Sequence, residues 1–138
     1  MNMGDSIQVQ RLGRSIEVEG VTHGNTPIPM GARVGNMIFS SGIMGKDPAT
    51  NKLPEDGPAQ AKFMFQNMRS LLENGGATLG NVVHMNAYVT DNIHREALNA
   101  EWLKCFPDPE DRPARLTRVM DLQSGMLLQI DIVAVVGS

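Results

Sequence analysis

The stretch DRPARLTRV, residues 111–119, determines how the C-terminal part of the chain is expected to fold. A proline lies near its start, and the residues that follow alternate as they do along a β-strand. The alternation puts Arg115 and Thr117 on one face of this strand and Leu116 on the other. Arg115 is then either one more charge on a solvated sheet or a group that holds a ligand.

The last strand supplies the context for Arg115. Residues 126–136, MLLQIDIVAVV, place Gln129 and Asp131 on the less apolar of their two faces. If the intervening DLQSG closes a hairpin, Arg115 lies opposite Asp131 and Thr117 lies opposite Gln129. One interpretation is a cross-strand salt bridge between Arg115 and Asp131. The other is that the guanidinium grips a ligand carboxylate through two parallel hydrogen bonds, with Asp131 orienting it.

The remaining elements follow from periodicity and turn residues. The expected order is a strand at residues 16–21, strands at 33–34 and 37–41 joined by a Gly-Asn turn, a helix between Asp56 and Gly75, a strand at 81–91, a helix at 92–106, and strands at 112–120 and 126–136. Asp56 is the expected N-cap of the first helix, and Gly75 and Gly76 are expected to end it in a left-handed conformation.

Three apolar stripes are expected to form the core. The first helix contributes Ala61, Met64, Phe65, Met68, Leu71 and Leu72. The strand at 81–91 contributes Val83, Met85, Ala87 and Val89, and the second helix Ile93, Ala97, Leu98, Trp102 and Phe106.

Two helices can cover only one face of such a sheet, so the class is α+β with an uncovered second face. That face is predicted to carry His84, Asn86, Arg115 and Asp131 among apolar residues. We expect copies of the chain to pack these faces together around a polar interior. An open, solvated antiparallel face is the alternative.

Length and composition limit the function classes. The 138 residues predict one domain at 15–138 behind a loose tail at 1–14. A net charge of −3 argues against a nucleic-acid partner. The single cysteine, Cys105, excludes an intrachain disulfide and fits a reducing, cytoplasmic compartment. No apolar run approaches the roughly 18 to 20 residues of a membrane helix, and the three histidines lack metal-ligand spacing, so no metal is expected.

Seven short segments in a fixed order carry a family resemblance. They are GNMIFSSG at 35–42, DPATNKLPED at 47–56, QNMRSLLENGGATLGNVV at 66–83, AYVTD at 87–91, ALNAEW at 97–102, RPAR at 112–115 and QIDIVAVV at 129–136. On these segments, from about Ile16 to Val136, the chain resembles the RidA family, also called the YjgF or L-PSP endoribonuclease-like family.

The resemblance implies a chorismate-mutase-like fold, with a mixed sheet, two helices on one face, and a homotrimer with a cleft at each subunit interface. It also implies hydrolysis of 2-imino acids to 2-keto acids and ammonia, without a metal or an organic cofactor. The arginine of the family's PAR motif, here Arg115, would bind the carboxylate of the small substrate.

The chain departs from the deaminating members at three positions. Gln129 stands where they carry a glutamate that positions water, and a glutamine cannot take a proton from it. Ile28 stands in place of a tyrosine, and Thr117 in place of a cysteine. Asp131 is a candidate substitute base, and His23 is a loop histidine that could enter the cleft, although most loop histidines are simply surface residues.

Further positions match the family's cleft lining. They are Ser41 and Gly42, with Ile43 beside them, and Asn99 near the start of the second helix. The predicted catalytic set is Arg115, Gln129 and Asp131. The predicted substrate-binding set is Arg115, Thr117, Ser41, Gly42, Ile43, Asn99 and Ile28.

Three functions remain open from the sequence. The first is a deaminase of small imino or enamino carboxylic acids. The second is a non-catalytic trimer that binds small carboxylates. Gln129, in place of the family's glutamate, favours this second function over the first. The third, an endoribonuclease, has the least support, because the chain is acidic and shows no general acid/base pair with basic residues around it.

Overall fold

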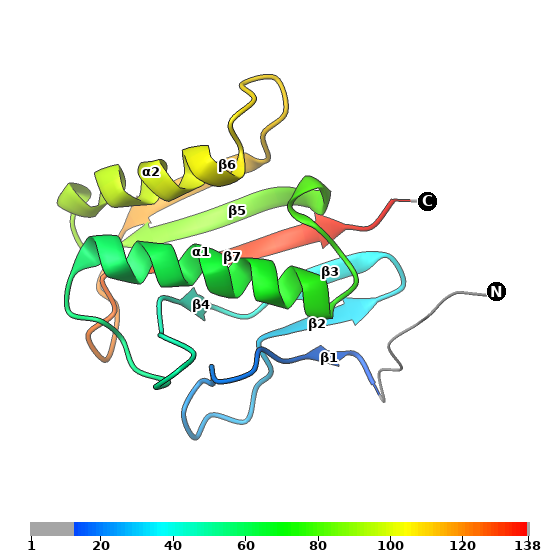
Figure 1. Ribbon diagram of the computed structural model, residues 1–138, viewed down its shortest axis with the longest axis horizontal. Coiled ribbons are helices and arrows are strands. Elements are labelled where there is room, and N and C mark those ends of the chain that lie inside the picture. The colour runs from blue at the N-terminus through cyan, green and yellow to red at the C-terminus, as the bar shows by residue number, and fades with distance from the viewer. Residues whose placement is uncertain (1–12, 138) are drawn as a thin grey trace.

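The computed structural model of the protein describes residues 13–137 and has a mixed α+β fold, as predicted (Figure 1). Its elements are β1 (Ser15–Ile16), β2 (Gly31–Val34), β3 (Met37–Ser40), β4 (Ile43–Met44), α1 (Gly57–Asn74), the 3-10 turn η1 (Leu79–Asn81), β5 (Val82–Val89), the 3-10 turn η2 (Asn92–His94), α2 (Arg95–Cys105), β6 (Ala114–Val119) and β7 (Leu128–Val135). The predicted loose tail at 1–14 lies almost entirely outside the described residues.

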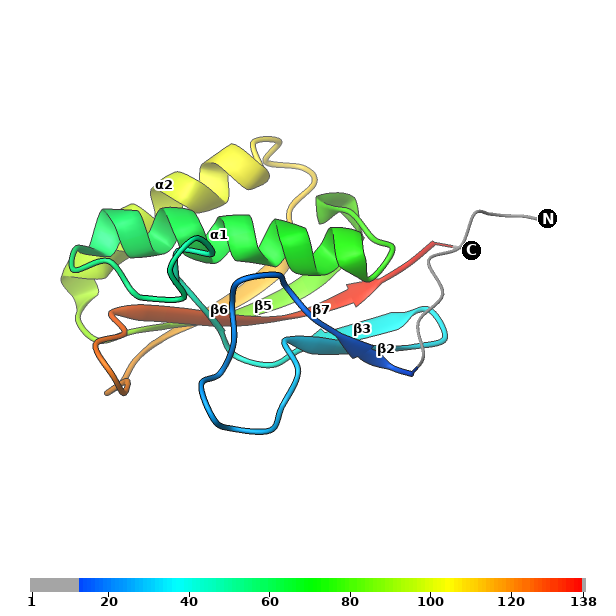
Figure 2. The same ribbon diagram turned by 60° about the horizontal axis from the view of Figure 1, so that its bottom comes forward.

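The strands form one sheet in the order β1-β2-β3-β7-β5-β6, and β4 pairs with β7 beside β3. All pairs are antiparallel except β5 and β6, which α2 connects in a parallel crossover. Both helices lie on the same side of the sheet, as the turned view shows (Figure 2). This arrangement confirms the prediction of two helices on one face, and it leaves the second face uncovered.

The predicted hairpin between the last two strands is wrong, because β5 lies between β6 and β7. Arg115 is therefore opposite Met85 on β5, whereas Asp131 is opposite Asn86. Met85 is fully buried under the helices, so Arg115 shares the helix-covered face and Asp131 lies on the other. The predicted salt bridge between Arg115 and Asp131 does not form, since the two side chains point to opposite sides of the sheet.

The loop at residues 120–127 accounts for the wrong prediction of a hairpin. It passes across the end of β5 instead of closing a hairpin, and it hydrogen-bonds to β5 on both sides. The Met120 N–H donates to the carbonyl of Val89 at 2.9 Å, and the Thr90 N–H donates to the carbonyl of Leu127 at 3.0 Å. Alternation within a strand fixes which residues share a face but does not say which strand is the neighbour.

Helix α1 forms as predicted. Asp56 caps it, and its carboxylate accepts from the Ala59 N–H at 3.0 Å. At the other end, Gly75 keeps a right-handed φ of −87°, so the predicted left-handed end is confirmed only at Gly76, whose φ is +82°. The whole predicted stripe is buried: Ala61, Met64, Phe65, Met68, Leu71 and Leu72. The helix packs this stripe on the sheet and so forms much of the core.

The buried residues of strand β5 differ from the prediction at the start of the strand. Met85, Ala87 and Val89 are buried as expected, but Val83 is 50% exposed and Val82 is buried in its place. The register with β7 shifts between Val82 and His84, so a bulge reverses the alternation at this end.

The buried residues of helix α2 also differ from the prediction at one position. Leu98 and Phe106 are buried, with Ala97 and Trp102 partly so, but Ile93 is 75% exposed. Ile93 belongs to η2, which precedes the first turn of α2 and does not continue its stripe. The first strand is also shorter than predicted: only Ser15–Ile16 pairs in the sheet, and Val18 and Val21 bridge to each other.

The uncovered face of the sheet has an apolar part and a polar part. Strand registers place Ala32, Val34, Met37, Phe39, Val133 and Val135 on the apolar part. The polar part, on β5 and β7, carries Asn86, Tyr88, Gln129 and Asp131. Phe39 is 54% exposed and Val34 is 64% exposed, so this face leaves large apolar side chains in contact with solvent in the single chain.

Candidate functional site

The predicted site residues divide into two groups on opposite faces of the sheet. Arg115, Thr117 and Asn99 lie on the helix-covered side at the edge strand β6. Gln129 and Asp131 lie on the uncovered side of β7. We call these groups the arginine half (Arg115, Thr117, Asn99 and Trp102) and the glutamine half (Gln129, Gly42, Ser41, Ile28 and His23).

The arginine half forms between the edge of the sheet and α2. The Nη2 atom of Arg115 donates to the Oδ1 atom of Asn99 at 2.8 Å. The Cζ atom of Arg115 lies 4.8 Å from the centre of the Trp102 ring, within the range of a cation–π contact. Asn99 and Trp102 are three residues apart on α2 and therefore share the face that meets Arg115.

The guanidinium of Arg115 has no countercharge. No carboxylate of the described residues lies within 4.0 Å of it, and its buried Nη1 atom has no hydrogen-bond partner. Burial lowers the pKa of Arg115, and the nearby positive charge of Arg95 lowers it further. An arginine keeps its proton at neutral pH in any case, so a partly buried positive charge with free donors remains. Its planar fork matches the two oxygens of a carboxylate.

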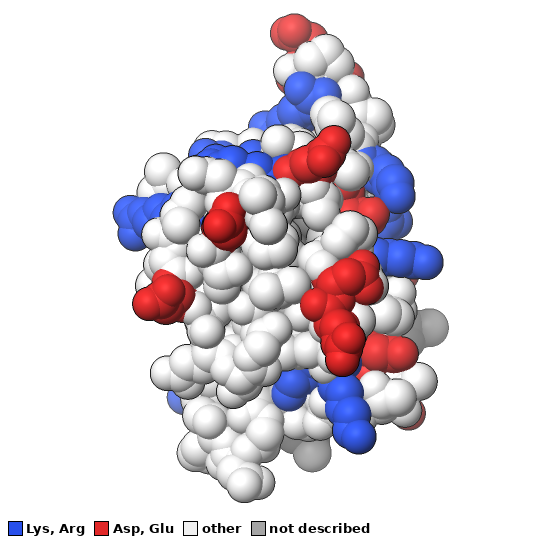
Figure 3. Space-filling model, turned by 90° about the vertical axis from the view of Figure 1, so that its left-hand side faces the viewer, with Lys and Arg blue, Asp and Glu red and all other residues white. Residues whose placement is uncertain are grey.

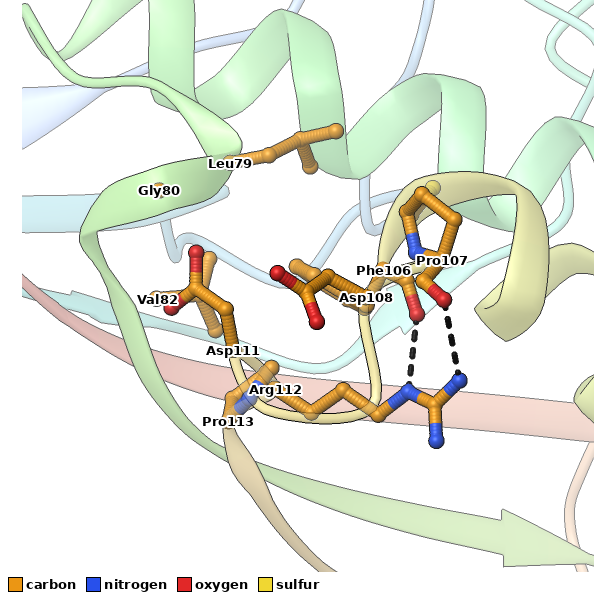
Figure 4. Close-up of a pocket in the computed structure, with 10 residues that line it drawn as sticks. Leu79, Gly80, Val82, Phe106, Pro107, Asp108, Asp111, Arg112 and Pro113 are labelled. Carbon is orange, nitrogen blue, oxygen red and sulfur yellow. Dashed lines mark hydrogen bonds between the residues drawn. The ribbon is translucent and has the colours of Figure 1, made fainter.

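Arg112, three residues earlier, is bound instead to main-chain carbonyls of its own loop (Figure 4). Its Nε atom donates to the carbonyl of Phe106 at 2.9 Å, and its Nη2 atom donates to the carbonyl of Pro107 at 3.3 Å. These bonds fix the loop between α2 and β6. The pocket beside it, about 350 Å³ in volume, is lined by none of the predicted site residues. Arg112 therefore supports the strand that presents Arg115.

The glutamine half depends on a close approach between Gly42 and Gln129. A Cβ atom at Gly42 would lie 2.5 Å from the Nε2 atom of Gln129, so a larger residue would displace this side chain. The Ser41 hydroxyl donates to the carbonyl of Pro29 at 2.8 Å and ties the loop at 22–30 to the sheet. Part of this loop hangs below the uncovered face (Figure 2).

Two further residues of the predicted set differ in exposure. Ile28, in the loop at 22–30, is 46% exposed and lines the hollow between this loop and residues 123–126. Ile43 is fully buried in the core on β4, paired with Ile130. Its side chain therefore cannot contact a ligand, and only its main chain is left for that role.

His23 lies in the glutamine half. From the sequence, a place for this histidine in the cleft was only one of two interpretations. Its Nε2 atom lies 2.7 Å from the carbonyl oxygen of Gly42. Because a carbonyl can only accept, Nε2 carries the proton and Nδ1 is the bare acceptor. That Nδ1 atom is buried and has no hydrogen-bond partner. The unpartnered Nδ1 atom of His23 therefore lies in a loop that contacts Gly42, the glycine next to Gln129.

Asp131 is bound within its own face of the sheet. Its two oxygens accept from the Asn86 amide at 2.9 Å and from the Tyr88 hydroxyl at 3.1 Å. Partial burial raises the pKa of Tyr88, and the charge of Asp131 raises it further. Asp131 therefore does not orient Arg115, which corrects that part of the prediction.

The site chemistry available is ionic and neutral-polar. Among residues 13–137, no group of three or more His, Cys, Asp and Glu side chains is arranged to hold a metal ion. Within the same range, no helix is long and apolar enough to cross a membrane. One half can hold an anion, and the other offers an amide and an imidazole.

Arg95 and Trp102 were not among the site residues predicted from the sequence. Their spacing contained the signal, because Arg95, Asn99 and Trp102 follow the i, i+4, i+7 pattern of a single helix face. Trp102 was assigned to the core stripe alone. It does pack against the core, and the same ring also contacts Arg115.

Comparisons with known proteins agree with this architecture. The family model described as Endoribonuclease L-PSP matches residues 28–136. A RutC family protein of Aquifex aeolicus is 34% identical over 79% of this chain and 92% of its own. The 2-iminobutanoate/2-iminopropanoate deaminase of Escherichia coli is 28% identical over 90% and 98%. The crystal structure of E. coli TdcF with bound serine superposes with a TM-score of 0.80 at 25% identity, covering 90% of this chain and 99% of that one. This chain therefore belongs to the Endoribonuclease L-PSP family, the family of the RidA, YjgF and RutC proteins.

Proposed function

We propose that the protein is a hydrolytic deaminase of small 2-imino or enamino carboxylic acids that releases 2-keto acids and ammonia. The observation that carries the proposal is the partly buried guanidinium of Arg115, which has free donors and no countercharge. A relative is named as a deaminase of 2-iminobutanoate and 2-iminopropanoate, and another family member binds serine, also a small carboxylate.

In the proposed reaction Arg115 binds the substrate carboxylate and fixes the position of C2. A water molecule, oriented by the Gln129 amide, attacks C2 of the C=N bond. The C–N bond of the resulting carbinolamine then breaks, both protons of the water end on nitrogen, and ammonia leaves a C2 carbonyl behind. Gln129 can orient the water but cannot take its proton.

Two groups on the uncovered side can assist the proton transfer. Asp131 lies two residues after Gln129 on the same face of β7, and its negative charge favours a positively charged imine nearby. His23 offers its bare Nδ1 atom as a proton acceptor. Neither group touches the arginine half within one chain.

The two halves therefore meet only if a second copy contributes one of them. We propose a homotrimer of chorismate-mutase-like subunits, in which the arginine half of one subunit and the glutamine half of the next line each interface cleft. Two features support this assembly. The uncovered face exposes Phe39 and Val34, and β6 is an edge strand that a neighbour can approach.

A non-catalytic carboxylate-binding trimer is the second candidate, and Gln129 in place of an acidic residue favours it. Ribonuclease activity, which the family description names, has less support. Positive and negative side chains are interspersed on the end of the molecule shown in Figure 3, without a continuous basic stripe. A phosphate backbone is gripped by such a stripe.

The test measures ammonia and keto-acid release from freshly generated 2-iminopropanoate and 2-iminobutanoate. Wild type is compared with Arg115→Ala, with Gln129→Glu, and with Lys62→Ala as a control that removes an exposed cation on α1. The proposal predicts activity in wild type and Lys62→Ala, loss in Arg115→Ala, and a gain in Gln129→Glu. Wild type that is inert, yet still binds keto acids through Arg115, would support the binding protein instead.

A further inference from the structure

The arginine half contains a second guanidinium, that of Arg95. Arg95 opens α2 one turn before Asn99, the residue that accepts a hydrogen bond from Arg115. Residues four apart on a helix lie side by side, with about 5–6 Å between their Cβ atoms. Arg95 and Arg115 are therefore neighbours on either side of Asn99, and the two charges are close enough to repel each other.

Arg95 is held in place by a neutral group. Its Nε atom donates to the Oδ1 atom of Asn92 at 2.7 Å, and its side chain is partly buried. This bond leaves the Nη atoms of the fork for another partner.

The acidic residues near Arg95 in the sequence do not neutralise it. Asp91 accepts from the Ile93 N–H at 2.9 Å as the cap of η2, and Glu101 pairs with Lys104 at 3.0 Å. Glu96 is exposed, and no carboxylate of the described residues lies within 4.0 Å of the Arg95 guanidinium. Within residues 13–137, the two arginines thus form a cationic pair without a carboxylate counter-ion.

Two positive charges held close together repel each other when no ligand is bound. A ligand with one negative charge neutralises only one of them. A ligand with two carboxylates satisfies both forks. We propose that Arg95 binds a second carboxylate of the substrate, so that the site prefers 2-imino dicarboxylic acids over monocarboxylic ones. This inference rests on the proposed function, and it makes Arg95 the residue that sets the preference.

One helical turn separates Arg95 from Asn99 on α2, and Arg115 reaches the same Asn99 from β6, so a ligand that contacts both forks would pass beside Asn99. Asn99, which binds Arg115 from between them, would face the middle of such a ligand. The Trp102 ring lies against the Arg115 guanidinium, with 4.8 Å between the Cζ atom and the ring centre.

The first experiment measures binding of product acids by calorimetry, so it does not depend on turnover. The probes are 2-oxoglutarate and 2-oxobutanoate, and the proteins are wild type, Arg95→Gln, and Lys104→Gln. Lys104→Gln makes the same charge change on the same helix at a side chain that is 68% exposed. We expect wild type and Lys104→Gln to prefer 2-oxoglutarate by about 10-fold or more. Arg95→Gln should lose this preference while it retains 2-oxobutanoate binding.

Equal affinity for the two acids in wild type, or a preference that survives Arg95→Gln, would overturn the inference. The second experiment compares hydrolysis of 2-iminoglutarate and 2-iminobutanoate by the same proteins. Turnover of both imines at equal efficiency leaves the proposed function standing and removes the role of Arg95. If the protein prefers 2-oxoglutarate in binding but hydrolyses neither imine, the role of Arg95 is supported and the proposed deaminase activity is contradicted.

Discussion

The arginine half and the glutamine half use polar groups in opposite ways. On the helix-covered side, a charged guanidinium is placed between a tryptophan and an asparagine, with no acid to neutralise it. On the uncovered side, the only carboxylate of the polar part, Asp131, accepts hydrogen bonds from Asn86 and Tyr88, and Gln129, two residues earlier on the same face of β7, is a neutral amide. Under the proposed function, the first half would bind the charge of the substrate, and the second would orient water at the bond that reacts.

Their separation is as informative as their chemistry. A sheet lies between them, so neither half reaches the other in one chain, and under the proposed function a neighbouring subunit completes the site. The exposed apolar part of the uncovered face gives such a neighbour a surface to bury. A substitution that disrupts this face should therefore abolish both assembly and activity. A substitution in one half of the site should abolish activity and leave assembly intact.

The largest effect is expected from Arg115→Ala. Truncation of one partner of a buried charge pair costs about 2–5 kcal/mol of binding free energy, so kcat/KM should fall by about 100-fold or more. Arg115→Lys should fall between wild type and Arg115→Ala, because it keeps the charge but loses the fork.

Arg112→Ala is the matched control, three residues away on the same segment. It removes two hydrogen bonds to main-chain carbonyls and should lower the unfolding free energy by about 1–3 kcal/mol. Denaturant unfolding and steady-state kinetics distinguish the two variants. If Arg112→Ala and Arg115→Ala lose activity equally without loss of stability, the distinction between a loop-fixing and a ligand-binding arginine is wrong.

The second prediction concerns the uncovered face. Phe39→Glu places a charge in the apolar part, and the trimer should dissociate into monomers in sedimentation velocity experiments because a buried charge has no partner there. Val83→Glu is the control, since Val83 is also about half exposed but lies at the bulge of β5. A Phe39→Glu protein that remains trimeric would show that this face is not the interface.

The smallest effect is expected at Tyr88, the only tyrosine of the chain. Partial burial and Asp131 raise its pKa in the folded protein, so its neutral form stabilises the fold. That contribution is fully present below pH 10, the pKa of an unperturbed tyrosine, and it is lost as the pH rises through the higher folded value.

Absorbance at 295 nm follows this single phenol through an alkaline titration. The folded protein should ionise at higher pH than the protein in denaturant, and Tyr88→Phe should remove the transition and cost about 1 kcal/mol. Ionisation at the same pH in both states would mean that the bond to Asp131 contributes nothing.

Elements with strong local signals could be predicted from the sequence. The stripe and the N-cap of α1 were predicted correctly, and the left-handed end was right for Gly76 though not for Gly75, because these features depend on residues close in sequence. The apolar face of β7 followed from alternation for the same reason. The bulge at Val82 and Val83 was missed, because an extra residue in one strand depends on the strand beside it.

The candidate site shows the same limit. Arg115 could be identified from its motif, and the departure at Gln129 from the resemblance. Their placement on opposite faces could not, because it depends on β5 lying between β6 and β7. The contacts of His23 with Gly42 and of Arg115 with Trp102 join segments far apart or on different elements, so no single stretch of sequence contains them.

Mixed trimers test the central claim most directly. Arg115→Ala disables one half, and Gly42→Leu displaces Gln129 in the other. Each variant is made alone, confirmed as a folded trimer, and the two are then co-refolded in equal amounts and assayed for keto-acid release. If each cleft joins two subunits, random assembly should restore about a quarter of the wild-type sites. If activity in the mixture stays at the level of the separate variants, each site lies within one chain and the account is wrong.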